Sequence, residues 1–333
     1  MTDQPAIKLM EKVMFEVKKV IVGQDLLLER LIIGLLARGH VLVEGVPGLA
    51  KTMAIKSLSS AIGGDFQRIQ FTPDLVPADL IGTRIYNQRT GEFSTSLGPV
   101  FTNLLLADEI NRAPAKVQSA LLEVMQERQV TIGRETHSVP DPFLVMATQN
   151  PIESEGTYPL PEAQVDRFML KVVVEYPTPT EEFVIVDRMT QALAKVDQVI
   201  STEQLESLQA QADAVYVDPA LKEYAVKLVI SSREPTRTGQ DHISKYISFG
   251  ASPRASINIV LAGRALAFLR GRTYALPEDM RDVARDVMRH RMVLSYEALA
   301  DGVTADDVVG QLMHALPIPE VAMADIVAAA QKS

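Results

Sequence analysis

Residues 45–52, GVPGLAKT, place two glycines and a proline just before a Lys-Thr pair. The short apolar run His40–Glu44 precedes them and is typical of a strand in a covered parallel sheet. After them, apolar residues recur at helical spacing until Gly63-Gly64 ends the pattern. Strand, glycine-rich loop and helix in this order form a phosphate-binding loop, because backbone N–H groups and the helix dipole attract an anion. The chain is therefore predicted to bind a nucleoside triphosphate.

Within this loop, Lys51 is expected to reach the β- and γ-phosphates and Thr52 to place its hydroxyl on Mg²⁺. The residue before the lysine is Ala50, where the usual pattern has glycine. A methyl group there predicts a backbone outside the conformations that only glycine adopts readily. The predicted nucleotide-binding residues are Gly45, Val46, Pro47, Gly48, Leu49, Ala50, Lys51 and Thr52.

A second motif follows at Asn103–Ala107, an apolar run that stops at Asp108-Glu109. In phosphoryl transfer, an Asp at a strand end holds magnesium and a neighbouring carboxylate polarises the attacking water. Asp108 is therefore predicted to bind the metal and the nucleotide, and Glu109 to be catalytic. The alternative is an acidic pair that caps a following helix.

Composition excludes several classes. The 333 residues are 47% apolar and 23% charged, as in a soluble protein, and no apolar run is long enough to span a membrane. Zero cysteines exclude thiol chemistry and fit a reducing compartment, so a cytoplasmic location is expected. The net charge of −9 disfavours nucleic-acid binding. Five scattered histidines lack metal-ligand spacing and are interpreted as structural or surface residues.

Five segments together resemble the MoxR family of AAA+ ATPases. They are GVPGLAKT (45–52), LLLADEINRAP (104–114), FLVMATQNP (143–151), EAQVDRF (162–168) and SPR (252–254). They occur in the family's order, and Ala50 also resembles the family pattern. The resemblance covers most of the chain and implies an ATP hydrolase that uses ATP and Mg²⁺.

The resemblance also implies roles for single residues. Asn150 resembles the sensor-1 residue, although its neighbour Gln149 could hold that role instead. Arg167 resembles an arginine finger that reaches the γ-phosphate in a neighbouring subunit, and Arg254 resembles the sensor-2 arginine. Val22-Gly23-Gln24 resembles the segment that lines the adenine pocket. Judged without the family, Asn150 also fits a turn, Arg167 a local ion pair, and Arg254 a solvated position on a helix.

Two predicted hairpins, Thr83–Ser94 and Gln129–Val139, have turns at residues 89–91 and at Gly133-Arg134. In position they resemble the helix-2 insert and the pre-sensor-1 hairpin of the branch that includes MoxR and the magnesium chelatases. That likeness implies that Tyr86, Phe93 and Arg134 face the central pore of a ring. The alternative is a pair of ordinary surface hairpins.

The predicted fold is α/β: a P-loop AAA+ core with a central parallel sheet flanked by helices, followed by a smaller all-α lid domain. Prolines at 177 and 179 favour a boundary there, giving a core at 1–178 and a helical lid at 179–333. Helical patterns in the lid run through Leu221–Val229 and Ile257–Leu269, and a third begins at Pro277.

The expected function is chaperone-like remodelling or maturation of a partner protein, driven by ATP hydrolysis in a hexameric ring. The resemblance implies a partner with a von Willebrand factor A domain. Three alternatives stay open: a magnesium-chelatase-like motor subunit, a nucleotide-gated scaffold with negligible turnover, and a ring that works on DNA.

Overall fold

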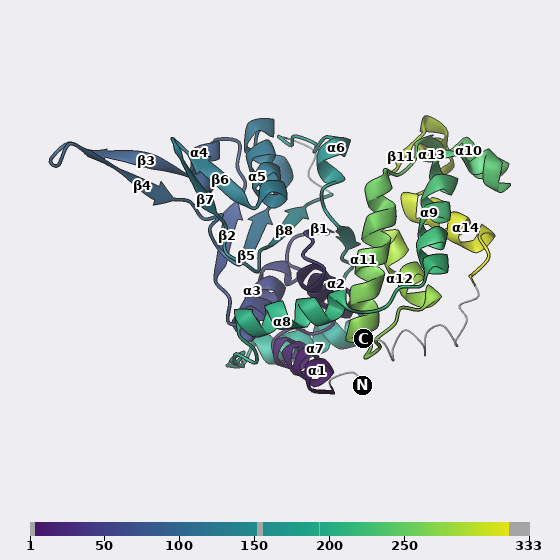
Figure 1. Ribbon diagram of the computed structural model, residues 1–333, viewed down its shortest axis with the longest axis horizontal. Coiled ribbons are helices and arrows are strands. Elements are labelled where there is room, and N and C mark those ends of the chain that lie inside the picture. The colour runs from purple at the N-terminus through teal and green to yellow at the C-terminus, as the bar shows by residue number, and fades with distance from the viewer. Residues whose placement is uncertain (1–3, 152–155, 193, 320–333) are drawn as a thin grey trace. The chain divides into compact units, whose positions relative to one another are not determined.

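The computed structural model describes residues 4–151, 156–192 and 194–319 (Figure 1). Contacts within the chain divide it into two compact units. The sheet unit comprises Leu9–Phe168 and Val172–Ser207, and the helical unit comprises Met1–Lys8, Met169–Lys171 and Leu208–Ser333. This division differs from the expected boundary after residue 178. Residues 179–207 group with the sheet unit, where Val199 N–H donates to the Ala61 carbonyl at 2.8 Å.

A five-stranded sheet in the order β2-β5-β8-β1-β9 forms the centre of the sheet unit (Figure 1). Its strands are β1 (Val41–Glu44), β2 (Phe66–Gln70), β5 (Leu104–Asp108), β8 (Leu144–Gln149) and β9 (Leu170–Val173). The pairings of β2, β5, β8 and β1 are all parallel. Strands β1, β5 and β8 are buried along nearly their whole length, which explains their continuous apolar runs. The central parallel sheet predicted from the sequence is confirmed.

Helices surround this sheet. They are α1 (Gln4–Lys18), α2 (Asp25–Leu36), α3 (Lys51–Ile62), α4 (Pro77–Ile81), η1 (Ile110–Arg112), α5 (Ala115–Glu127), α6 (Glu162–Val165), α7 (Pro179–Met189) and α8 (Thr202–Asp213), of which α1 and α8 cross the division. Helix α3 begins at Lys51, directly after the phosphate-loop segment, and ends at Gly63. Gly63 caps the helix with φ +64°, a left-handed conformation that glycine adopts without strain.

Both predicted hairpins are present. Strands β3 (Gly82–Asn87) and β4 (Glu92–Leu97) form the first, which projects away from the sheet, and β6 (Gln129–Ile132) and β7 (Glu135–Ser138) form the second (Figure 1). Thr95 Oγ1 donates to Glu135 Oε2 at 3.2 Å and links the two.

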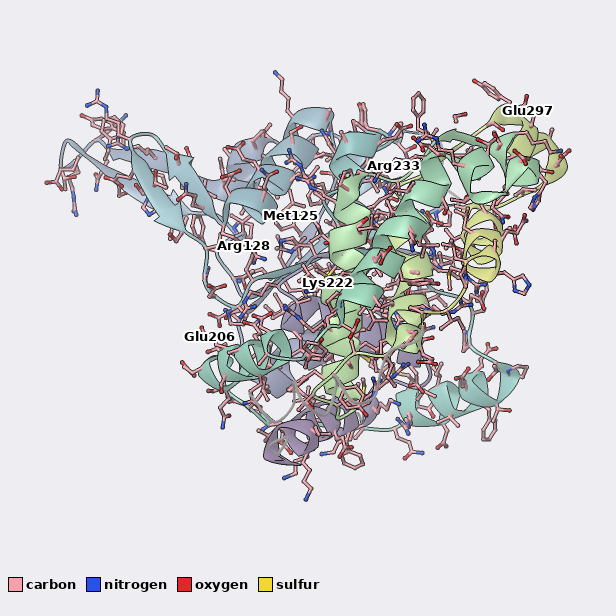
Figure 2. The ribbon with its side chains drawn as sticks, turned by 45° about the vertical axis from the view of Figure 1, so that its right-hand side comes forward. Met125, Arg128, Glu206, Lys222, Arg233 and Glu297 are labelled. Carbon is pink, nitrogen blue, oxygen red and sulfur yellow. The ribbon has the colours of Figure 1, made fainter. Side chains whose placement is uncertain are left out.

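A buried histidine joins β1 to two other elements of the sheet unit. His40 Nδ1 accepts from Val145 N–H at 3.0 Å, and Nε2 lies 3.1 Å from the carbonyl of Met125. Met125 belongs to α5 and is labelled in Figure 2. Burial, helped by the charge of Arg128, lowers the pKa of His40 from 6.5 to about 3. The imidazole is therefore neutral at neutral pH and carries its proton on Nε2.

The helical unit contains the expected helices and one short ladder. Its elements are α9 (Pro219–Arg233), η2 (Pro235–Thr238), α10 (Asp241–Ser244), β10 (Ile247–Phe249), α11 (Pro253–Leu269), α12 (Pro277–Met288), β11 (Val293–Leu294), α13 (Tyr296–Asp301) and α14 (Ala305–Ala315). Strands β10 and β11 pair antiparallel, a feature that the sequence patterns did not predict.

Across residues 4–151, 156–192 and 194–319, the structure contains no helix with the length and apolar character needed to cross a membrane.

Candidate functional site

The loop between β1 and α3 has the geometry of an anion cradle. A Cβ atom on Gly45 would meet the Val174 carbonyl at 2.9 Å, so the backbone passes too close for a larger residue. Gly48 has φ +87°, where a side chain would strain the backbone. Ala50 has φ +55° and ψ +17°, so the expectation that it avoids the left-handed region is wrong. A left-handed alanine costs about 1 kcal/mol, which the surrounding fold has to offset.

Lys51 folds back over this loop, where its Nζ donates to the Gly45 carbonyl at 2.5 Å. Burial lowers the pKa of Lys51, while the charges of Asp108 and Glu109 oppose that shift. The ammonium group therefore lies between the loop and the two acids, where an anionic ligand would meet it.

The acids at the end of β5 are held by neighbouring strands. Thr148 Oγ1 donates to Asp108 Oδ1 at 2.6 Å and accepts from the backbone N–H of Glu109 at 2.8 Å. Arg68, on β2, contacts Asp108 Oδ2 through Nε at 3.1 Å and Nη2 at 2.7 Å. Three parallel strands thus bring polar side chains to one edge of the sheet, where ligands of α/β proteins bind.

Glu109 has its own donors. Gln70 Nε2 donates to Glu109 Oε2 at 2.7 Å, and Arg112 Nη1 donates to the same oxygen at 3.0 Å. Glu109 adopts φ +55° and ψ +51°, a left-handed conformation that is uncommon for a residue with a Cβ. Glu109 stands at the N-cap position of η1 but makes no side-chain capping hydrogen bond, so the alternative of an acidic pair that caps a following helix is not favoured.

These groups line one cavity of about 470 Å³, a size that suits a small-molecule ligand. Its polar lining residues include Lys51, Thr52, Arg68, Asp108, Glu109 and Asn150. Its apolar lining residues include Val20, Ile21, Val22, Pro177, Ile185 and Met189. A cavity lined by cations and acids together with apolar side chains suits a ligand that has both charged groups and an apolar ring.

The cavity collects most of the residues predicted from the sequence. They are Pro47, Gly48, Leu49, Ala50, Lys51, Thr52, Asp108, Glu109, Asn150 and Val22. Asn150 is buried and lines the cavity. Gln149 does not line it, and its backbone carbonyl accepts a hydrogen bond from Gly45 N–H at 3.2 Å. Val46 and Gly23 are next to lining residues in the chain, and Gly45 precedes Val46, but none of the three lines the cavity itself.

Two predicted residues lie elsewhere. Arg167 lines a separate polar hollow of the sheet unit, with Glu123 and Glu127 of α5 and Gln164 of α6. Arg254 is an exposed residue in the first turn of α11, and its N–H donates to the Ser252 side chain at 3.2 Å. It belongs to the helical unit, which the sequence also predicted.

The sequence patterns missed Arg68, Gln70 and Thr148, and also Ile185 and Met189 of α7. Arg68 and Gln70 are two positions apart on β2, and therefore share one face. Gln70 pairs in register with Asp108, so the rule that parallel strands end at one edge could have found it.

Family comparisons agree with this geometry. The model of the ATPase family associated with various cellular activities (AAA) matches residues 40–170, and an AAA lid domain matches residues 240–312. The first match contains the phosphate loop and both acids, and the second lies in the helical unit. The fold and the site together define an AAA ATPase with a lid.

Relatives that match nearly the whole chain show to which family of AAA ATPases it belongs. The chain is 55% identical over 312 residues to the chaperone MoxR1 of Mycobacterium tuberculosis, covering 94% of this chain and 83% of the relative. It is 31% identical to protein MoxR of Methylorubrum extorquens, covering 91% and 93%. The crystal structure of a protein assigned as an ATPase from Cytophaga hutchinsonii has a TM-score of 0.90 and 46% identity, over 95% and 96%. The chain belongs to the MoxR family of AAA+ ATPases, and is an ATP hydrolase of chaperone-like type.

Proposed function

We propose that this ATPase binds ATP together with Mg²⁺ and uses hydrolysis to remodel or mature a partner protein. The observation that supports it most is the meeting of Lys51, Thr52, Asp108, Glu109 and Asn150 in one cavity. Hydroxyl and carboxylate oxygens are the ligands that Mg²⁺ prefers, and this ion completes its shell with water and phosphate oxygens. Thr52 and Asp108 would hold it, and it would supply charge neutralisation at the phosphates.

In this proposal each residue has a separate task. Lys51 leaves the Gly45 carbonyl for the phosphates, since a charged phosphate oxygen is a stronger acceptor than a neutral carbonyl. Glu109 orients and deprotonates the attacking water, and Asn150 helps to position that water. Gln70 and Arg112 hold the Glu109 carboxylate in place until the nucleotide arrives. The apolar lining residues, Val22 among them, receive the adenine ring.

The proposal includes a ring, hexameric in this family, in which Arg167 completes the site of a neighbouring subunit. Its support is that Arg167 lines a different hollow from the one that holds Lys51 and Asp108. Head-to-tail contacts of this kind close into rings. Arg254 would contact phosphate from the lid. A cytoplasmic location stays part of the proposal, because zero cysteines fit a reducing compartment.

A mixing experiment tests the shared site. Turnover per subunit should rise with protein concentration, and Arg167→Ala should lower it by about 10³–10⁵. Arg167→Ala and Glu109→Gln, each inactive alone, should regain activity when mixed, since an intact Glu109 and an intact Arg167 can then meet at one interface. Turnover that is independent of concentration, with no regain on mixing, would contradict the shared site.

The β3–β4 hairpin is the proposed contact for the partner, including a von Willebrand factor A domain protein. Ile85, Tyr86, Phe93 and Leu97 are each about half exposed. The rings of Tyr86 and Phe93 contact each other with centroids 5.0 Å apart and planes inclined by 47°, and the Arg84 guanidinium lies 4.7 Å from the centre of the Phe93 ring. A rigid aromatic pair flanked by a cation suits an apolar segment of a protein client.

Fluorescein-labelled casein, an unfolded model client, can test this surface. The double change Tyr86→Ser with Phe93→Ser should weaken its binding by at least about tenfold, because two aromatic contacts are lost. The matched control is Tyr296→Ser with Leu299→Ser, two exposed apolar residues of α13. Equal loss in both double variants, measured by fluorescence anisotropy, would show that general surface hydrophobicity and not the hairpin binds the client.

A further inference from the structure

Arg68 stands out among the residues of the cavity, because it occupies the carboxylate proposed for the metal. It extends from β2 toward the end of β5 and contacts Asp108 Oδ2 through two nitrogens, at 3.1 and 2.7 Å. Thr148 donates to Oδ1 of the same carboxylate at 2.6 Å. Both oxygens of Asp108 therefore already accept hydrogen bonds from the protein.

This arrangement opposes the approach of a cation to Asp108. A magnesium ion, or a water molecule bound to it, would need an Asp108 oxygen that faces the cavity. The guanidinium of Arg68 lies on Oδ2 and carries a positive charge that repels the ion. Arg68 and the metal therefore compete for this carboxylate.

Arg68 is the more exposed member of the pair. Its side chain is 48% exposed, whereas that of Asp108 is only 16% exposed, so water can solvate the arginine when it leaves the carboxylate. Arg68 also lines the cavity itself, and its Nη2 contacts Gln70 Oε1 at 2.9 Å.

We propose that Arg68 is a metal-exchange residue, and this inference rests on the proposed magnesium site. Without metal it neutralises Asp108, which would otherwise repel the phosphates of the incoming nucleotide together with Glu109. When the metal takes Asp108, Arg68 leaves that carboxylate. Arg68 thereby competes with the metal and lowers the dependence of nucleotide binding on Mg²⁺, and it acts as a positioning residue.

The coupling can be measured without hydrolysis, from the binding of mant-AMPPNP, a fluorescent ATP analogue that is not cleaved. The quantity is the ratio of the Kd in excess EDTA to the Kd in saturating Mg²⁺. In Arg68→Ala, Asp108 repels the metal-free nucleotide, and Mg²⁺ no longer competes with an arginine. The ratio should therefore rise about fivefold, the size expected for a partly exposed ion pair.

Arg68→Lys keeps the charge and should give a smaller rise in the Kd ratio. This variant separates an effect of the missing charge from an effect of impaired folding. Lys56→Ala, an exposed cation of α3 outside the cavity lining, is the matched control and should keep the wild-type ratio. A wild-type ratio of one would refute the magnesium site, and the exchange with it. A wild-type ratio above one that stays the same or falls in both Arg68 variants would overturn the exchange alone.

Discussion

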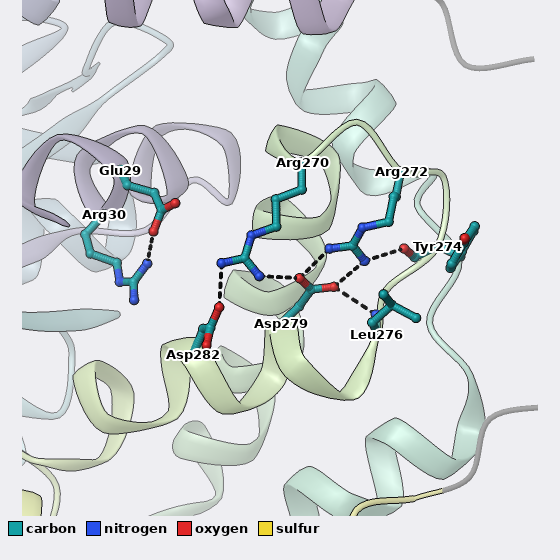
Figure 3. Close-up of polar contacts among 8 residues, drawn as sticks. All are labelled: Glu29, Arg30, Arg270, Arg272, Tyr274, Leu276, Asp279 and Asp282. Carbon is teal, nitrogen blue, oxygen red and sulfur yellow. Dashed lines mark hydrogen bonds and ion pairs between the residues drawn. The ribbon is translucent and has the colours of Figure 1, made fainter. Parts of the chain in front are cut away.

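The two units each hold an aspartate with arginine side chains, but in opposite environments. In the helical unit, Asp279 is fully buried and accepts four bonds: from Arg270 at 3.0 Å, twice from Arg272 at 2.6 Å, and from Leu276 N–H at 2.8 Å (Figure 3). In the sheet unit, Asp108 is partly exposed, its arginine partner is half exposed, and both border a cavity.

The difference teaches how a carboxylate becomes structural or functional. Four donors fill the lone-pair positions of Asp279, and no water can replace them once the site is sealed. This carboxylate fixes the start of α12 to the end of α11, because Leu276 and Arg270 belong to those termini. Asp108 accepts fewer hydrogen bonds, and its partner Arg68 is exposed enough to turn away from it toward the solvent. Only the open arrangement allows a ligand to replace the hydrogen-bond donors that the protein supplies to the carboxylate.

The largest expected effect on stability comes from Asp279→Asn. This substitution keeps the volume but leaves two guanidinium groups beside an uncharged amide, and breaking a buried pair costs about 3–5 kcal/mol. We expect the loss in the free energy of unfolding to lie near the lower end of this range, since Arg270 and Arg272 are partly exposed. Hydrogen exchange of peptides from α11 and α12 should accelerate, which reports on the helical unit without assuming that the whole chain unfolds together.

Two matched variants test whether burial is the cause. Asp301→Asn removes a surface carboxylate of the same unit, which pairs with Lys245 at 3.1 Å, and should accelerate exchange much less. Asp108→Asn makes the same chemical change in the open site and should cost about 1 kcal/mol or less in stability. Equal losses for Asp279→Asn and Asp108→Asn would break the comparison.

Much of this architecture follows from the sequence. The strand, loop and helix around Lys51, the strand that ends at Asp108 and both hairpins were predicted from local patterns, since each depends on residues close in the chain. The helices that contain Leu221–Val229 and Ile257–Leu269, and the helix that begins at Pro277, were predicted for the same reason. Phosphate-loop and acidic residues were found because their spacing reflects ligand geometry.

What was missed depends on contacts between distant segments. Arg68 reaches Asp108 across 40 positions of sequence, and Ile185 and Met189 join the cavity from beyond the expected boundary. The third helical pattern was predicted to begin at Pro277, but no local pattern shows that Asp279 in its first turn binds Arg270 and Arg272. Ala50 was expected to avoid a conformation that tertiary packing imposes on it. Local patterns carry no information about such partners.

A more gradual effect, spread over several pH units, is expected from His40, a polar group that is buried like Asp279 but uncharged. Its pKa is about 3 in the folded protein and 6.5 when unfolded, so the unfolded chain binds a proton more readily. Stability from this group is complete above pH 6.5 and is lost as the pH falls toward 3. The loss should approach about 1.4 kcal/mol per pH unit within this window.

His40→Gln tests this assignment, because a glutamine amide can accept from Val145 N–H and donate to the Met125 carbonyl without titrating. The free energy of unfolding should then vary less between pH 6.5 and 4.5, a range above the ordinary pKa of carboxylates. His314→Gln, at an exposed position on α14, should keep the wild-type slope. An unchanged slope in His40→Gln would mean that the imidazole accepts a proton in place, and that sealing alone does not keep a polar group neutral. Asp279, which is sealed but charged, would then owe its role to its four donors and not to burial.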